Sequence, residues 1–218
     1  MPTVTTEGLI LRRVNFGEAD RILTVLTDRY GKISVTARGV RKITSRRAGN
    51  IEVLNRVKRH LFKSKSYTLT EAESIETFQS IKDNLTLSTY AFHILELIHR
   101  LVPEEQRNPN IYALVLEILE LLKSSPRQIF IRAFEVKLLT QLGFYSPDAL
   151  KDMKNATKEV LDKLQYSSWE EIGELKIQEE QAIELERVLR YYIERILEGS
   201  LKSVQVMNKL KGKSKNGR

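Results

Sequence analysis

A change in hydrophobic period near residue 78 is the feature that most constrains how this chain can fold. Between residues 5 and 75, apolar residues alternate with polar ones in short runs, as at Ile33, Val35 and Ala37. From residue 78 onward they recur at intervals of three and four. A period of two is typical of strands with one buried face, and the longer period is typical of amphipathic helices. The sequence therefore predicts an α+β fold, with a sheet domain followed by a helical one.

The front of the chain is predicted to form a small barrel. Five short runs indicate strands, at residues 9–12, 21–27, 33–37, 57–63 and 67–72. Gly31 lies between the second and third runs and suits a hairpin turn that requires positive φ. The OB-fold is the commonest barrel of this size and strand number. We therefore expect an OB-fold β-barrel over residues 1–78.

The rest of the chain is predicted to be an all-α domain over residues 79–208, followed by a disordered basic tail over 209–218. Two dipeptides, Asn108-Pro109 and Ser125-Pro126, join an N-cap residue to a proline at the first helical position. The run from Ser168 to Glu171 has the form of a capping box and predicts another helix start.

The net charge of +8 is unevenly distributed along the chain. Residues 1–80 hold 15 Lys/Arg and 8 Asp/Glu, whereas residues 81–200 hold 15 and 20. The last 18 residues hold six Lys/Arg and no acidic residue. Basic ends around an acidic middle favour a polyanion as partner.

The densest basic segment runs from Arg38 to Lys65, and only Glu52 opposes it. Cations along a line bind a phosphate backbone by releasing its counterions, and arginine can also stack on bases. A solvated segment whose charge only aids solubility is the alternative. The predicted DNA-binding residues are Arg38, Arg41, Lys42, Arg46, Arg47, Lys58, Arg59 and Lys63.

Motifs of catalysis are missing from the sequence. The chain has no cysteine, and its three histidines lack zinc-ligand spacing and are expected at the surface or at interfaces. There is no Gly-rich phosphate loop or Ser elbow, and Glu18 with Asp20 is better explained as a charged turn. We therefore expect a protein that is no enzyme and holds no metal or cofactor. Apolar runs are too short for a membrane span, and Met1–Glu7 does not resemble a signal peptide, so a cytoplasmic location is expected.

Several short blocks resemble the RecO family of bacterial recombination mediators, and they follow the family's order along nearly the whole chain. The blocks are Gly17-Glu18-Ala19-Asp20-Arg21-Ile22, Leu26-Thr27, Gly31-Lys32, Ala37-Arg38-Gly39-Val40-Arg41, Ser45-Arg46, Phe134-Glu135-Val136-Lys137-Leu138-Leu139, Gly143-Phe144-Tyr145-Ser146-Pro147 and Leu201-Lys202-Ser203.

The resemblance implies a function in recombinational DNA repair, at the nucleoid. Members of the family combine an OB domain with a helical domain, bind single- and double-stranded DNA and anneal complementary strands. They act with RecR, bind the C-terminal tail of single-strand-binding protein and help to load RecA on protein-coated strands. By this resemblance, Arg38, Arg41, Lys42 and Arg46 belong to the family's DNA-facing stretch.

The chain departs from the family at one place. Many members carry a four-cysteine zinc site after the block that ends here at Pro147, but residues 148–168 contain no cysteine or histidine. We expect a plain helix over residues 151–163, stabilised by packing around Leu161, Leu164 and Trp169. Two other classes stay open: a protein-interaction adaptor with a basic OB domain, and a nucleic-acid enzyme such as a nuclease.

Overall fold

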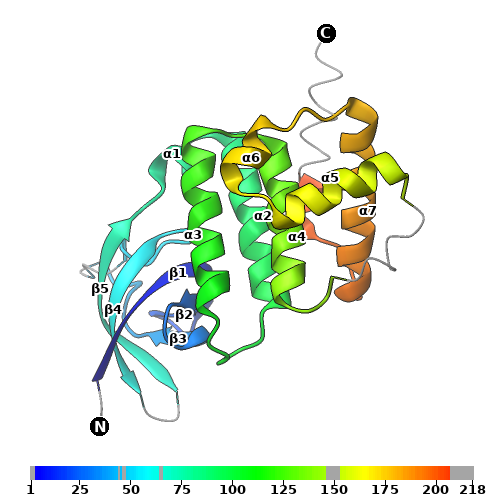
Figure 1. The fold of residues 1–218 in the computed structure, drawn as a ribbon. Coiled ribbons are helices and arrows are strands. Elements are labelled where there is room, and N and C mark those ends of the chain that lie inside the picture. The colour runs from blue at the N-terminus through cyan, green and yellow to red at the C-terminus, as the bar shows by residue number, and fades with distance from the viewer. Residues whose placement is uncertain (1–2, 44, 46–47, 64–65, 146–152, 207–218) are drawn as a thin grey trace. The chain divides into compact units, whose positions relative to one another are not determined.

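The computed structural model describes residues 3–43, 45, 48–63, 66–145 and 153–206 (Figure 1). The chain divides into two compact units, Met1–Tyr112 and Ala113–Arg218. The predicted basic tail at 209–218 lies outside the described residues. No helix within the described ranges is both long enough and apolar enough to cross a bilayer.

Five strands form a closed barrel in the first unit, in the order β1-β2-β3-β5-β4. Only the pairing of β3 with β5 is parallel, and the other four pairings are antiparallel. This arrangement confirms the predicted fold class, a small barrel of the OB type followed by helices. The strands are β1 (Thr3–Phe16), β2 (Asp20–Thr27), β3 (Gly31–Ala37), β4 (Arg56–Lys63) and β5 (Tyr67–Glu76).

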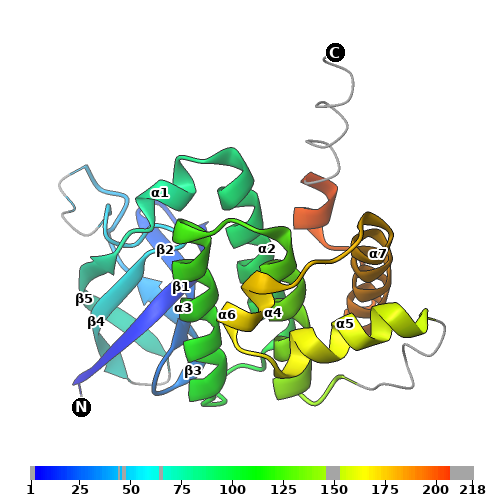
Figure 2. The same ribbon diagram turned by 45° about the horizontal axis from the view of Figure 1, so that its top comes forward.

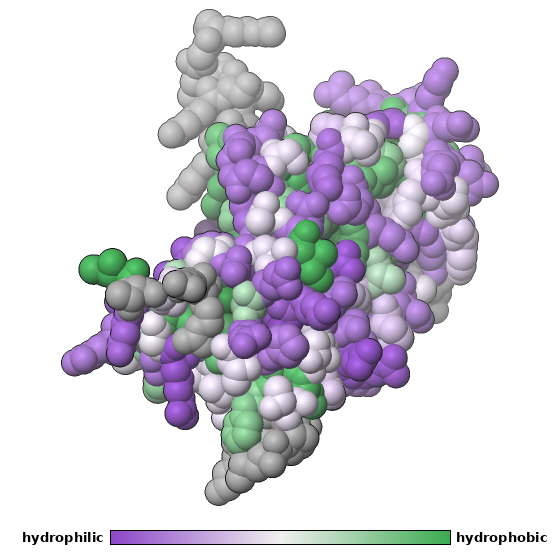
Figure 3. Space-filling view, turned by 90° about the vertical axis from the view of Figure 1, so that its left-hand side faces the viewer, coloured by the Kyte–Doolittle hydropathy of each residue, from purple (hydrophilic) through white to green (hydrophobic). Residues whose placement is uncertain are grey.

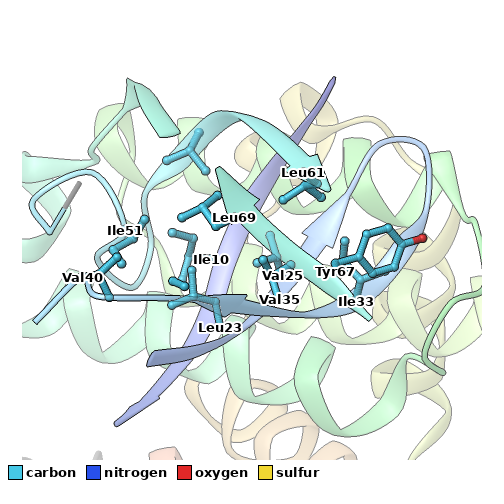
Figure 4. Packing of buried hydrophobic residues seen from close by; sticks show 12 residues of the cluster. Ile10, Leu23, Val25, Ile33, Val35, Val40, Ile51, Leu61, Tyr67 and Leu69 are labelled. Atoms are coloured by element: carbon cyan, nitrogen blue, oxygen red, sulfur yellow. The ribbon is translucent and has the colours of Figure 1, made fainter. Parts of the chain in front are cut away.

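The barrel is filled by the alternate apolar residues of its strands (Figure 4). Val40 and Ile51 belong to the same cluster, although both come from the segment between β3 and β4. Each is fully buried, so burial of apolar surface holds this connecting segment against the barrel. The strand residues of the cluster include Ile10, Leu23, Val25, Ile33, Val35, Leu61, Tyr67 and Leu69.

Helices begin directly after the barrel, with α1 (Gln79–Lys82) and α2 (Leu85–Leu101). The side chain of Asn84 caps α2 by accepting from two backbone N–H groups of the first turn. Since α2 contacts β1, the first compact unit extends to Tyr112. The strands end at Glu76 and the helices begin at Gln79, near the predicted boundary, whereas the compact units divide after Tyr112. The next helix, α3 (Pro109–Ser124), crosses the division between the two units.

In the second unit, the mostly buried helix α4 (Gln128–Gln141) contacts the three helices that follow it (Figure 2). These are α5 (Asn155–Tyr166), α6 (Trp169–Glu174) and α7 (Glu179–Ile196). The predicted capping box is present: the Ser168 hydroxyl accepts from the N–H of Glu171, whose carboxylate accepts from the N–H of Ser168. The predicted cap at Asn108 is present as well, and accepts from the N–H of Ile111.

Two local predictions were wrong. The dipeptide Ser125-Pro126 does not start α4, which begins at Gln128 with Arg127 in the extended N-cap conformation. The N–H of Ser125 still donates to Leu121, so this residue ends α3 and is not released to cap the next helix. His93 was expected at the surface or at an interface, but it is only 1% exposed and belongs to the buried face of α2.

The helix predicted over residues 151–163 is present as α5, which begins at Asn155 and ends at Tyr166, and residues 151 and 152 lie outside the described part of the chain. Leu161 and Leu164 of α5 are buried. The ammonium of Lys137 donates to the carbonyl oxygens of Gln165 and Ser167, at 3.1 and 2.8 Å, and lies 5.6 Å from the centre of the Trp169 ring. These contacts hold the link between α5 and α6 onto α4 by hydrogen bonds and a cation–π interaction. Among the described residues, no group of three or more His, Cys, Asp or Glu is placed to bind a metal.

Candidate nucleic-acid interface

Three of the predicted DNA-binding residues lie together in the segment that follows β3. We call residues 38–42 the basic loop, and its side chains Arg38, Arg41 and Lys42 are all exposed. Gly39 has a φ of 66°, a conformation that favours glycine and turns the chain sharply between Arg38 and Arg41. The basic loop therefore presents three cations within five residues to the solvent.

The basic loop is attached to the hairpin that joins β1 and β2. The N–H of Gly39 donates to the Asp20 carboxylate at 2.8 Å. The N–H of Arg41 donates to the carbonyl oxygen of Ala19 at 2.9 Å, and its guanidinium donates to that of Gly17 at 3.0 Å. Together with buried Val40, these bonds restrain the loop backbone and the side chain of Arg41.

The remaining predicted residues do not all join this cluster. Lys58 is exposed in the middle of β4, where its register partners are Glu7 and Glu73. Those two carboxylates reduce the positive potential around Lys58. Phe16, at the end of β1, is close in sequence to the hairpin that holds the basic loop. Glu7, the partner of Lys58, lies nine residues before Phe16 in β1, which is about 30 Å of extended chain. Arg46, Arg47 and the side chain of Lys63 lie outside the described part of the structure.

Arg59 requires a correction, because its side chain is fully buried. It alternates with Arg56, Lys58 and His60, and shares the inward face of β4 with Val57 and Leu61. Within the described part of the chain, its three guanidinium nitrogens have no hydrogen-bond partner. Burial lowers its pKa to about 10, a shift that Tyr112 and Asp28 only partly oppose. Arg59 is therefore no surface cation, and we exclude it from the interface.

Three arginines on β1, β2 and β4 are paired with carboxylates. Glu52 accepts from the guanidinium of Arg13 and also from that of Arg21, the latter at 3.4 Å. Arg56 donates to Glu7 at 2.7 Å. Glu52, the only acidic residue of the densest basic segment, thus neutralises arginines of β1 and β2 and leaves the basic loop exposed.

Sequence reasoning missed the part that the β1–β2 hairpin has in this site. Asp20 is more than a charged turn residue, because its carboxylate fixes the backbone of a loop 19 positions away. Phe16, next to the hairpin turn, is 56% exposed. The alternation of β1 could have indicated an outward Phe16, but no local signal could have joined Asp20 to Gly39.

A closed five-stranded barrel with this strand order places the first part of the chain in the class of OB-type domains. Comparison with known families gives matches along most of the chain. Residues 1–78 match the family model "Recombination protein O N terminal", and residues 82–147 match "Recombination protein O C terminal". The chain belongs to the RecO family.

Individual relatives support this assignment. The chain is 36% identical to DNA repair protein RecO of Dehalococcoides mccartyi over 170 residues, which are 77% of this chain and 66% of that protein. It is also 36% identical to RecO of Symbiobacterium thermophilum over 147 residues, 66% of this chain and 58% of that one. For RecO of Listeria monocytogenes, the identity is 35% over 64% of this chain and 55% of the relative. The chain therefore matches less than two thirds of the length of these relatives.

Proposed function

We propose that this protein binds single- and double-stranded DNA through the basic loop and mediates recombinational DNA repair without catalysing a reaction. Membership of the RecO family supports a role in DNA repair and recombination. The observation that carries the proposal is the attachment of exposed Arg38, Arg41 and Lys42 to the β1–β2 hairpin. A restrained cationic loop can bind phosphates with little loss of conformational freedom, because folding has already ordered it.

The mechanism follows from charge. Two DNA strands repel each other, and a protein that neutralises phosphates on both lowers the cost of bringing them together. The bases then pair by their own hydrogen bonds, so no catalytic residue is needed. By the same family membership, we propose that the protein anneals complementary strands, acts with RecR and the C-terminal tail of single-strand-binding protein, and assists RecA loading. A DNA partner implies that it works at the bacterial nucleoid.

The first experiment measures binding to a fluorescent single-stranded oligonucleotide by anisotropy over a series of salt concentrations. We expect log K to fall linearly with log salt. Arg41→Ala should lower the magnitude of the slope by about 0.7 for each phosphate that the variant no longer neutralises, and Arg41→Ala/Lys42→Ala should lower it further.

Arg29→Ala is the matched control, because Arg29 is exposed and lies in the same unit, beyond the opposite end of β2. It should leave the slope nearly unchanged. If Arg29→Ala and Arg41→Ala reduce the slope equally, binding depends on net charge and the basic loop is not the site. A wild-type protein without salt-dependent DNA binding would favour the adaptor alternative.

The finer activities require separate measurements. Complementary strands coated with single-strand-binding protein should anneal faster with the wild type than with Arg41→Ala/Lys42→Ala. Labelled DNA incubated with the protein and Mg²⁺ or Mn²⁺ should stay intact, whereas cleavage that copurifies with the protein would contradict a non-catalytic function.

A further inference from the structure

The outer face of the β1–β2 hairpin carries apolar side chains that the proposed phosphate contacts do not use. Arg13 of β1 pairs with Leu23, which belongs to the barrel core, so the two residues share the face of the hairpin that continues the barrel interior, although Arg13 itself is exposed. Their neighbours Val14 and Ile22 also pair with each other and consequently face outward. By the same alternation, Arg12 and Phe16 lie on the outer face beside Val14.

This outer face is exposed to solvent. Val14 is 43% and Phe16 56% exposed, and Ile22 is partly exposed. Figure 3 views the molecule from the side of the barrel, where hydrophilic residues predominate and apolar residues show between them. Single exposed apolar side chains are ordinary on protein surfaces. Phe16 differs from such single side chains because charged residues lie near it on the same hairpin.

Cations lie on either side of Phe16 along the chain, while its register partner across the hairpin is Asp20, whose carboxylate accepts from the N–H of Gly39. The carbonyl oxygen of Gly17, the residue after Phe16, accepts the hydrogen bond from the Arg41 guanidinium at 3.0 Å. In the other direction along β1, exposed Arg12 is four residues away, or about 13 Å. An aromatic ring and two aliphatic side chains therefore form an apolar strip between positive charges.

This combination matches the chemistry of an unpaired nucleotide. A base offers a flat apolar face that stacks on aromatic rings, and its phosphate requires a cation. In a duplex, the base faces are covered by their neighbours, so an aromatic side chain on an open surface cannot reach them. Charge complementarity with Arg12 and Arg41 favours a polyanion over an apolar protein segment as the occupant of this face.

We propose that Arg12, Val14, Phe16 and Ile22 form a stacking site for unpaired bases, with Phe16 as its platform and the basic loop holding the adjoining phosphates. The inference rests on the proposed function, since it assumes that DNA binds at the basic loop. It adds a source of preference for single strands, which phosphate contacts alone do not supply.

Phe16→Ala tests the inference by anisotropy against three ligands: a single strand, a duplex and a single strand of equal length made of abasic sugars. We expect affinity for the single strand to fall about tenfold. Affinity for the duplex and for the abasic strand should stay within about twofold, and the salt slope should not change because Phe16 carries no charge. Phe16→Tyr, which keeps a ring, should retain binding.

Phe92→Ala is the matched control, because Phe92 is 52% exposed on α2 in the same unit. It should bind all three ligands like the wild type. If Phe16→Ala behaves like Phe92→Ala while Arg41→Ala still lowers the salt slope, the stacking site is refuted and the proposed function stands. An equal loss on normal and abasic strands would also refute it, because it would indicate a distorted loop. Absence of DNA binding by the wild type would refute the proposed function itself.

Discussion

The carboxylate of Asp20 accepts a hydrogen bond from the backbone N–H of Gly39 at 2.8 Å, and this bond joins the start of β2 to the basic loop. An acidic residue thus fixes the backbone of a loop that carries three cations. Its charge opposes a phosphate, but its hydrogen bond orders the loop that we propose binds one. These two effects can be separated by substitution.

Asp20→Asn removes the charge and keeps an oxygen that can accept from Gly39, whereas Asp20→Ala removes both. We expect Asp20→Asn to bind single-stranded DNA as tightly as the wild type or slightly more tightly. Asp20→Ala should bind several-fold more weakly than Asp20→Asn and lose about 1 kcal/mol of unfolding free energy. Anisotropy and urea denaturation measure the two effects. If both variants bind equally, the bond to Gly39 does not order the loop.

Arg59→Met tests whether the buried guanidinium is a cost to stability. A buried charge without hydrogen-bond partners is unfavourable, and an apolar side chain of similar length removes that cost. We expect the free energy of unfolding to stay equal or to rise by about 1–4 kcal/mol. The salt slope of DNA binding should not change, because Arg59 is not exposed. If Arg59→Met has a smaller salt slope of DNA binding than the wild type, Arg59 takes part in the interface after all.

The gain from Arg59→Met should not depend on pH below about 10. The pKa of Arg59 is about 10 in the folded protein, below its ordinary value, so below pH 10 both folded and unfolded chains keep the proton. Above pH 10 the folded chain releases its proton first, and the cost of burial in the wild type declines. Urea denaturation at pH 7 and pH 9 should therefore give the same difference between wild type and variant.

Gly8→Ala should destabilise the barrel by about 3 kcal/mol or more. A Cβ atom at Gly8 would collide with the Arg59 guanidinium and would stand 2.5 Å from the carbonyl oxygen of Leu26, which is backbone and cannot rotate away. Gly49→Ala is the control, since a Cβ there meets nothing within 4 Å, and should change the unfolding free energy by less than about 0.5 kcal/mol. Equal unfolding midpoints for the two variants would contradict the close packing at Gly8.

His99→Gln should lose less unfolding free energy in mild acid than the wild type does. Burial lowers the pKa of His99, and the nearby charges of Lys32 and Arg12 lower it further. As the pH falls through 6.5, His99 binds a proton in the unfolded chain but not yet in the folded chain, so the wild type loses stability. Urea denaturation at pH 7.5 and pH 5 should show a larger difference for the wild type than for His99→Gln. An identical difference would mean that His99 titrates alike in both states.

Much of the proposed interface could be located from the sequence, and the errors of that prediction have physical causes. The basic loop was found because Arg38, Arg41 and Lys42 are close in sequence and follow a strand. Arg59 was assigned to the surface because cations were counted along a segment without regard to face. The alternation of Val57, Arg59 and Leu61 already indicated one inward face. Lys58 was correctly expected to be exposed, but its acidic partners lie on other strands.

The sequence by itself determined the strands, most of the helices, the capping box at Ser168 and the position of the basic loop. Each of these follows from local periodicity or from contacts within four residues, which a single segment specifies. Only the tertiary structure decided that Asp20 holds Gly39, that Glu52 neutralises Arg13 and Arg21, and that the guanidinium of Arg41 donates to the carbonyl oxygen of Gly17, the residue after Phe16. Those relationships depend on strand register and barrel closure, which arise when segments distant in the chain bury their apolar faces together.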